Sequence, residues 1–504
     1  MGKREQKRTP LWDALCAYRA QGIIPFHVPG HKQGRGNPEL TEKLGPTALG
    51  IDLTCMEGLD NILNPLDVIK EAQDLAADAF RAEHAYFLVN GTTSGIQAMI
   101  MAVCAPGEKL IVPRNAHRSV ISGLILSGVQ PIYLQPEVDQ RFGITHGITP
   151  QDVERALREH PDARGVFVIN PTYYGVASDL AGIVEVAHAR NVPVLVDEAH
   201  GAHLCFHPEL PPSAMEAGAD LSAASTHKLA GSLTQSSLLL HQGNLVNPQR
   251  VKGVLNLTQT TSPSYILLTS LDFARKQMAL AGTRLLAGVL RKARWVRKQL
   301  SRLPGIELLE EEHIEGRPGC RYLDPTKITM NVQQLGLSGQ EVESILRHKY
   351  RIQVELSDLY NIILLLSIGD SWEMVQHLVA SIQDLVQSLG KGGSISKFSR
   401  ALPPLPAALV SPRDAFYGET KTVTLDAAEG EISAEMIMAY PPGIPLICPG
   451  ERFTREIIDY VRILKAEGLI LQGTEDPHLE QVKVLAQNLV LVQQHRAVGE
   501  EVGS

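Results

Sequence analysis

Short apolar runs alternate with helical patterns through the first half of the chain. Turn residues bound each run, and the segments between runs repeat apolar residues every three to four positions. In residues 68–81, for example, Ile69, Ala72, Leu75, Ala76 and Ala79 fall on one helix face. This alternation predicts an α/β fold with a mostly parallel sheet covered by helices. The predicted strands are 85–89, 110–112, 131–134, 165–169 and 193–196.

The chain is too long for one compact core. Its 504 residues exceed the roughly 250–300 at which a single core stops growing. Gly and Pro punctuate the N-terminal part, and a Gly/Ser-rich stretch followed by a Pro-rich one indicates a linker. A basic amphipathic helix at 283–303 and a second helix at 372–389 are expected after the large domain. The predicted parts are an irregular arm (1–64), a large domain (65–282), a small α+β domain (283–390), a linker (391–410) and a C-terminal domain (411–504).

Composition narrows the class of partner. The net charge of −8 and the pI near 6.1 disfavour nucleic acid as a partner. No two of the six cysteines have CxxC spacing, so neither a metal site nor a disulfide scaffold is expected. The N-terminus lacks the apolar segment of a signal peptide, and no apolar run is long enough to span a membrane. We therefore expect a cytoplasmic protein with no membrane partner.

A candidate phosphate-binding loop follows the first predicted strand. Asn90-Gly91-Thr92-Thr93-Ser94-Gly95 precedes a predicted helix at 96–104. Backbone N–H groups at a helix N-terminus, together with small hydroxyl side chains, bind phosphate. An ordinary Ser/Thr helix cap is the competing interpretation.

An acidic residue ends another apolar run. Val194-Leu195-Val196 leads directly into Asp197, and in parallel sheets ligands bind at the carboxyl ends of the strands. A buried carboxylate needs a cationic partner or strong hydrogen bonds, and a protonated pyridine nitrogen is such a partner. A helix-capping or metal-binding aspartate is the alternative.

A lysine follows in Ser225-Thr226-His227-Lys228. A lone lysine is usually a surface residue, but desolvation in an apolar, hydroxyl-rich stretch disfavours its ammonium form, which makes Schiff-base lysines reactive. Phosphate loop, strand-end acid and lysine occur in this order along the chain. Pyridoxal 5′-phosphate (PLP) requires a phosphate cup, a counter-charge for its ring nitrogen and an amine. The sequence therefore predicts PLP as the cofactor.

These and further motifs resemble the Orn/Lys/Arg decarboxylases of the aspartate-aminotransferase fold, in the short form without an N-terminal wing domain. The resemblance covers nearly the whole chain and implies a PLP-dependent transferase-like major domain (fold type I), a C-terminal α+β domain and a homodimer with the active site at the subunit interface. The matching motifs are FHVPGHK (26–32), GLDN (58–61), LVNGT (88–92), RNAHRS (114–119), PTYYG (171–175), DEAH (197–200), STHK (225–228), PRDAF (412–416), AEMI (434–437), YPPGIP (440–445) and PGER (449–452).

The resemblance also implies residue roles. Lys228 would hold PLP, Asp197 would pair with its ring nitrogen, and His117 and Ala199 would cover the two ring faces. His200 would reach the ring hydroxyl, and Glu355 would pair with the distal cation of the substrate. Other residues expected to contact the cofactor are Thr92, Thr93, Ser94, Ser225 and His227, and those expected to line the substrate site are Thr172 and Tyr173.

Plainer interpretations compete with some of these roles. His117 could be an ordinary hydrogen-bonded histidine, and Glu355 a structural ion-pair partner. His27, His31 and Lys32 could only organise the N-terminal arm at a subunit interface, and the turn at 440–445 could be purely structural because Pro and Gly fix backbone geometry.

The reaction implied by the resemblance is decarboxylation of arginine, lysine or ornithine, as in polyamine biosynthesis, with a lean toward arginine and its product agmatine. Transamination or elimination on the same fold is one alternative. A catalytically silent PLP-fold protein that acts as a regulatory partner is another, because fold alone does not choose among activities.

Overall fold

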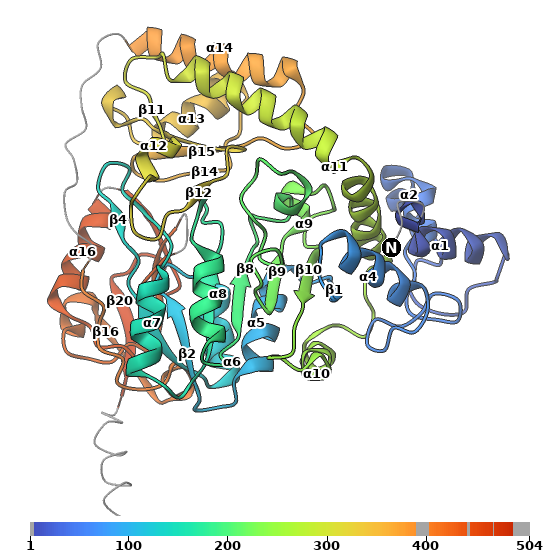
Figure 1. Ribbon diagram of the computed structural model, residues 1–504, viewed down its shortest axis with the longest axis horizontal. Coiled ribbons are helices and arrows are strands. Elements are labelled where there is room, and N and C mark those ends of the chain that lie inside the picture. The colour runs from blue at the N-terminus through green and yellow to red at the C-terminus, as the bar shows by residue number, and fades with distance from the viewer. Residues whose placement is uncertain (1–4, 390–402, 441–443, 467, 487–504) are drawn as a thin grey trace, which may run out of the picture.

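A seven-stranded sheet forms the centre of the large domain (Figure 1). The computed structural model describes residues 5–389, 403–440, 444–466 and 468–486. β10 pairs antiparallel with β1 and β9, whereas the other four pairs of the sheet are parallel, which confirms the predicted mostly parallel sheet. In spatial order the strands are β1 (His84–Leu88), β10 (Ser237–His241), β9 (Leu221–Ala224), β8 (Val194–Asp197), β6 (Ala163–Ile169), β2 (Lys109–Pro113) and β3 (Gln130–Leu134).

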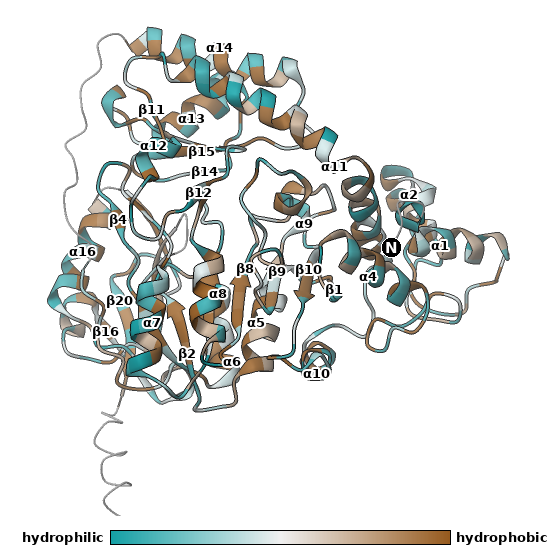
Figure 2. Cartoon of the chain, viewed as in Figure 1, coloured by the Kyte–Doolittle hydropathy of each residue, from teal (hydrophilic) through white to brown (hydrophobic). Residues whose placement is uncertain are grey.

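Both faces of this sheet are covered, which explains its continuous apolar runs. Successive residues of a strand point to opposite faces. In β8, Val194 and Val196 therefore join one hydrophobic cluster with α7 (Pro150–Glu159) and α8 (Leu180–His188). Leu195 joins the other cluster with α5 (Gly91–Val103) and α6 (Arg118–Ser127). Figure 2 accordingly shows mostly hydrophobic residues on the central strands, whereas α7 has both hydrophobic and hydrophilic residues.

The small domain has a four-stranded antiparallel sheet in the order β11 (Glu307–Leu308), β13 (Lys327–Asn331), β15 (Asn361–Leu365) and β14 (Leu356–Ser357). Helices α13 (Gly339–Tyr350) and α14 (Trp372–Leu389) belong to the same part of the chain, and α14 confirms the helix predicted at 372–389. The helix expected at 283–303 begins much earlier, because α11 runs unbroken from Tyr265 to Leu300. The predicted boundary after residue 282 therefore falls inside one helix that joins the two domains.

The N-terminal arm is not irregular throughout. It contains α1 (Pro10–Ala20), α2 (Pro38–Leu44) and α3 (Pro46–Ile51), and a proline opens each helix. Proline suits the first helical position because its missing N–H would have no helical partner there. The prolines that suggested irregular sequence therefore mark helix starts.

The C-terminal part has its own hydrophobic core. Helix α16 (Arg455–Ala466) supplies Ile457, Ile458 and Val461 to it. The other elements are α15 (Pro412–Tyr417) and the strands β16 (Thr420–Thr424), β17 (Ile437–Tyr440), β18 (Ile444–Ile447), β19 (Ile470–Gln472) and β20 (Gln481–Leu485). Most of the expected linker and the centre of the YPPGIP motif lie outside the described residues, at 390–402 and 441–443.

Candidate active site

A cavity of about 190 Å³ lies at the carboxyl ends of the central strands. Gly91 comes shortly after β1, Asp197 ends β8 and Ser225 follows β9, so the carboxyl ends of three strands of the sheet meet at one place. This is where ligands bind in open α/β sheets. The cavity brings together most of the predicted site residues: Thr92, Thr93, His117, Tyr173, Asp197, Ala199, His200, Ser225, His227 and Lys228.

The hydroxyl-rich end of the cavity surrounds the start of α5. This helix begins at Gly91, earlier than predicted, so Thr92, Thr93 and Ser94 form its first turn. The Thr92 hydroxyl is hydrogen-bonded to those of Ser225 and Ser237. The N–H groups of a first turn have no helical acceptors, so this end has the donors that a phosphate group requires.

His227 lies beside this helix start. Its Nδ1 atom is 2.9 Å from the Ser236 carbonyl oxygen, which can only accept. Nδ1 therefore carries a proton and donates. That hydrogen bond fixes the orientation of the ring. Because His227 lines the cavity, its Nε2 atom can contact a ligand there.

Asp197 provides a buried acidic side chain in the same cavity. Only 5 % of the residue is exposed, and its Oδ1 atom accepts a hydrogen bond from the Ala199 N–H at 3.0 Å. Burial raises the pKa of Asp197, while that hydrogen bond and the nearby Lys228 act in the opposite direction. Because burial disfavours the carboxylate, a cation beside Asp197 would stabilise its charged form. The protonated pyridine nitrogen of PLP fits this position.

The amine of Lys228 faces the same cavity. Burial lowers the pKa of Lys228, although the carboxylates of Asp197 and Glu355 act to raise it. Its Nζ atom lies 2.8 Å from Nε2 of His200 and 5.8 Å from the centre of the Tyr173 ring. A desolvated lysine with a lowered pKa is a nucleophile suited to a Schiff base. Phosphate donors, buried acid and amine together therefore fit PLP.

His117 is the N-cap residue of α6. Its Nδ1 atom accepts a hydrogen bond from the Ser119 N–H at 3.2 Å, so the ring proton is on Nε2. Burial, together with the positive charges of Lys228 and Arg118, lowers the pKa of His117 to about 4. The ring is therefore neutral at neutral pH and lines the cavity as a flat surface.

Three predicted site residues do not line this cavity. The Ser94 hydroxyl donates to the Gly91 carbonyl at 2.8 Å, and the buried Thr172 hydroxyl accepts from the Val176 N–H at 3.2 Å. Both hydroxyls therefore stabilise local backbone. Glu355 is exposed and lies near the two lysines, where its charge opposes the burial that lowers the pKa of Lys228 and of Lys327.

The histidines of the FHVPGHK motif serve the N-terminal arm. Nε2 of His27 lies 2.8 Å from the Tyr18 hydroxyl, and Nε2 of His31 lies 3.1 Å from the Asp52 carboxylate. Nζ of Lys32 donates to the His27 carbonyl oxygen. These contacts support the interpretation that the motif organises the arm.

Lys327 is the site residue that the sequence reasoning missed. It lies on β13 of the small domain, is fully buried, and places Nζ 3.2 Å from Nδ1 of His200. Burial is the main reason that the pKa of Lys327 falls to about 8. Lys327 precedes Ile328 and Met330, which alternate as in a buried strand. A lysine in such a strand could have indicated a functional residue, because lysine is almost never fully buried unless it is paired.

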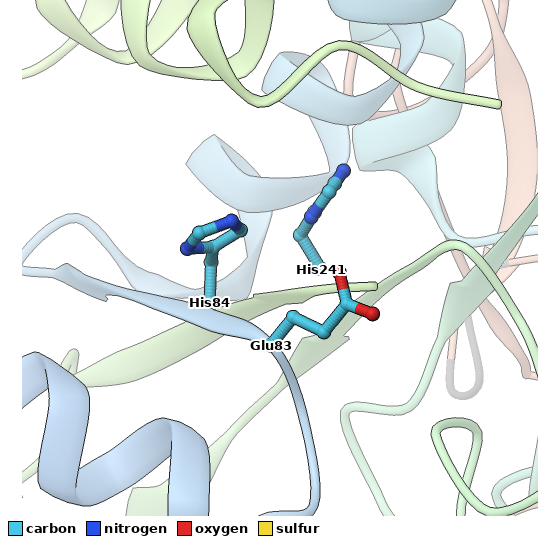
Figure 3. A group of neighbouring side chains, drawn as sticks. All are labelled: Glu83, His84 and His241. Carbon is cyan, nitrogen blue, oxygen red and sulfur yellow. The ribbon is translucent and has the colours of Figure 1, made fainter. Parts of the chain in front are cut away.

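A separate group of potential metal ligands lies at the edge of the sheet (Figure 3). His84 of the edge strand β1 is paired with His241 of β10, and Glu83 precedes β1. Nε2 of His241 is hydrogen-bonded to the Val246 carbonyl at 2.8 Å, and the Gly243 N–H donates to Glu83 at 3.3 Å. None of the three lines the cavity, so the group adds nothing to its chemistry.

Within the described ranges, no helix combines the length and the apolar character that crossing a membrane requires.

Comparison with known proteins agrees with the cavity's chemistry. The model of the Orn/Lys/Arg decarboxylase major domain matches residues 9–374, and that of the family's C-terminal domain matches residues 397–475. An arginine decarboxylase of Bacillus subtilis (strain 168) is 47 % identical, over 95 % of this chain and 98 % of the relative. One of Bacillus anthracis is 46 % identical, over 96 % of this chain and 99 % of the relative.

The fold has solved counterparts. The constitutive lysine decarboxylase of E. coli superimposes with a TM-score of 0.82 at 22 % identity, over 95 % of this chain and 82 % of that one. At this identity the likeness concerns the fold alone, which is that of the PLP fold-type I enzymes.

Proposed function

Because this chain belongs to the Orn/Lys/Arg decarboxylase family, we propose that it is a PLP-dependent arginine decarboxylase that releases carbon dioxide and agmatine. Membership makes it a carboxy-lyase that acts on a basic amino acid. The observation that carries the proposal is that the Lys228 amine and the Asp197 carboxylate line one cavity. The choice of arginine rests on the relatives described as arginine decarboxylases.

Each part of the cofactor has a partner in this proposal. The first-turn N–H groups of α5 and the side chains of Thr92, Thr93, Ser225 and His227 hold the phosphate. The Lys228 amine would hold the aldehyde carbon, and Asp197 would keep a proton on the ring nitrogen. His117 and Ala199 would lie against the ring. PLP, when bound, supplies a conjugated ring that accepts the electron pair of the breaking carbon–carboxylate bond.

The chain's own residues then orient the substrate and move protons. Tyr173 and His117, which both line the cavity, restrict the space around the reacting carbon. Glu355, exposed and near the two lysines, attracts the distal cation of the substrate. The proton that replaces carbon dioxide at Cα comes either from Nε2 of His117 or from Nζ of Lys228.

The proposal includes a homodimer in the cytoplasm that takes part in polyamine biosynthesis. Exposed apolar side chains on the N-terminal arm support the dimer, because exposed apolar patches mark interaction sites. Ile24, Phe26 and Val28 are 73 %, 94 % and 62 % exposed. All six cysteines are free thiols, as suits a reducing compartment.

The test offers the purified, PLP-loaded enzyme arginine, lysine and ornithine separately and identifies the products. We expect carbon dioxide and agmatine from arginine, with slower or no turnover of the other two. A 2-oxo acid product would indicate transamination instead. Failure to release carbon dioxide from any of the three would overturn the proposal. The Lys228→Ala variant is the matched inactive control.

A further inference from the structure

The His200 ring lies between two lysines from different domains, of which Lys327 is buried and Lys228 is half-buried. Nε2 is 2.8 Å from Nζ of Lys228, and Nδ1 is 3.2 Å from Nζ of Lys327. Lys327 also donates to the His200 carbonyl at 3.3 Å. His200 is 4 % exposed and Lys327 is fully buried, so water does not complete these hydrogen bonds.

This geometry limits the protons that the three groups can hold. A neutral imidazole has one donor nitrogen and one acceptor nitrogen, whereas an ammonium group only donates. If both lysines were ammonium ions, both ring nitrogens would have to accept, and neutral imidazole cannot do so. One lysine must therefore be a free amine that accepts from the ring.

Burial lowers the pKa of Lys327 to about 8, but its contacts oppose this effect and favour Lys327 as the charged lysine. Its Nζ atom is 4.0 Å from Oδ2 of Asp324, and neither residue is exposed. The Thr326 hydroxyl donates to Oδ1 of Asp324 at 2.7 Å, and Nε2 of His203 lies 3.2 Å from Oδ2. These contacts favour the carboxylate form of Asp324, because hydrogen bonds to the charged form stabilise it. A buried carboxylate at this distance in turn stabilises the Lys327 ammonium.

Three other groups act on the Lys228 amine. The carboxylates of Asp197 and Glu355 favour its protonation, and His117 is neutral at neutral pH. The pKa of Lys228 nevertheless falls, with burial as the largest cause. The pKa of His200 lies well below its ordinary value because of burial and the two lysines. The direction of the His200 pKa is consistent with an uncharged ring, and the hydrogen-bond geometry then requires one of its two neighbours to be an amine.

We propose that Lys327 is a positioning residue: its ammonium donates to Nδ1 of His200, holds the ring proton on Nε2, and so keeps the Lys228 nitrogen as a free amine. The small domain thereby prepares the nucleophile of the large domain. The proposal rests on the proposed function only in taking Lys228 as the residue that binds the cofactor. Lys327 itself does not line the cavity.

The test measures the protonation of Lys228 directly in the cofactor-free protein. Reductive methylation modifies only free amines, so its initial rate at Lys228, followed by mass spectrometry across pH, gives the midpoint for proton loss. In Lys327→Met or Lys327→Gln, the ring proton can move to Nδ1 and Lys228 can keep its own proton. We expect the midpoint to rise by about one pH unit or more, the scale of losing a neighbouring like charge.

Two control variants separate this effect from a general loss of structure. Lys327→Arg retains a donating cation and should restore the midpoint toward the wild-type value. Lys349→Met removes an exposed lysine and should leave it unchanged. Circular dichroism identifies the variants that fold, and only these are compared. Using both Lys327→Met and Lys327→Gln gives two side chains that can fill the space left by the buried lysine.

An unchanged Lys228 midpoint in a folded Lys327→Met or Lys327→Gln protein overturns the proposal. So does the same upward shift in Lys327→Arg, since that result would indicate packing rather than charge. Neither readout involves an amino acid substrate. A failed decarboxylation assay together with a shifted midpoint would therefore refute the proposed function alone.

Discussion

Arg114 and Glu451 form a buried, two-point ion pair that joins the C-terminal domain to the segment before His117. Nη2 of Arg114 lies 2.8 Å from Oε2 of Glu451, and the two side chains are 5 % and 1 % exposed. Arg114 also donates to the carbonyls of Pro445 and Leu446, and the Cys448 N–H donates to Glu451. The C-terminal domain is therefore anchored three residues from a wall of the cavity.

Removing one partner of this pair is expected to destabilise the protein strongly. In Glu451→Ala the Arg114 charge stays buried without its counter-ion, which typically costs about 3–5 kcal/mol. We expect a large fall in the urea midpoint of the C-terminal domain. Lys483→Ala, which breaks a more exposed pair with Glu475, should cost less than about 1 kcal/mol. Equal midpoints for the two variants would show that the buried pair does not anchor the domain.

Asp197→Asn should separate cofactor binding from turnover. The amide is nearly the same size but carries no charge, so it cannot stabilise a proton on the ring nitrogen. We expect absorbance of the bound cofactor to persist while kcat falls by roughly 10²–10³-fold, the scale of losing one electrostatic contact in a catalytic site. Wild-type turnover in this variant would remove the assigned role of Asp197.

Glu355→Gln should mainly affect recognition of the substrate's distal cation. Because Glu355 is exposed, the loss should be modest, a roughly fivefold rise in KM for arginine with kcat less affected. Steady-state kinetics with arginine and lysine measure both the affinity and the selectivity. Unchanged values for both substrates would return Glu355 to a structural role.

The depressed pKa of His117 predicts loss of stability in acid. It falls from the ordinary 6.5 to about 4 on burial, so the unfolded chain binds this proton first as the pH falls. Above pH 6.5 this histidine does not reduce the free energy of unfolding. As the pH falls from 6.5 to about 4, the reduction grows. His117→Gln should therefore show a shallower fall in thermal midpoint between pH 6.5 and pH 4.5 than the wild type. Parallel curves would mean that this histidine is protonated equally in both states.

Strong apolar runs made part of the fold predictable. Residues 165–169 and 193–196 are continuously apolar because their strands, β6 and β8, are covered on both faces. β9 was missed because its sequence, Leu-Ser-Ala-Ala, is short and contains a serine, even though all four residues are buried. Ser222 is tolerated there because its hydroxyl donates to the buried Glu198 at 2.7 Å. Such a tertiary partner is invisible in the local pattern.

The candidate site was predictable where chemistry follows chain order. Asp197 ends β8 and Lys228 lies in the short helix after β9, and parallel strands bring their carboxyl ends together. Lys327 comes from another domain, and only tertiary folding places it beside His200. Ser94 was assigned to a loop because the start of α5 was placed too late; within the helix, its hydroxyl bonds to the Gly91 carbonyl instead.

The covalent attachment of the cofactor at Lys228 is the central claim, and borohydride reduction tests it most directly. Reduction of the PLP-loaded enzyme fixes the imine, and peptide mass spectrometry then locates the modified lysine. We expect the phosphopyridoxyl group on Lys228 alone, with none in Lys228→Ala. Modification of a different lysine, or none in an enzyme that binds PLP, would contradict the account.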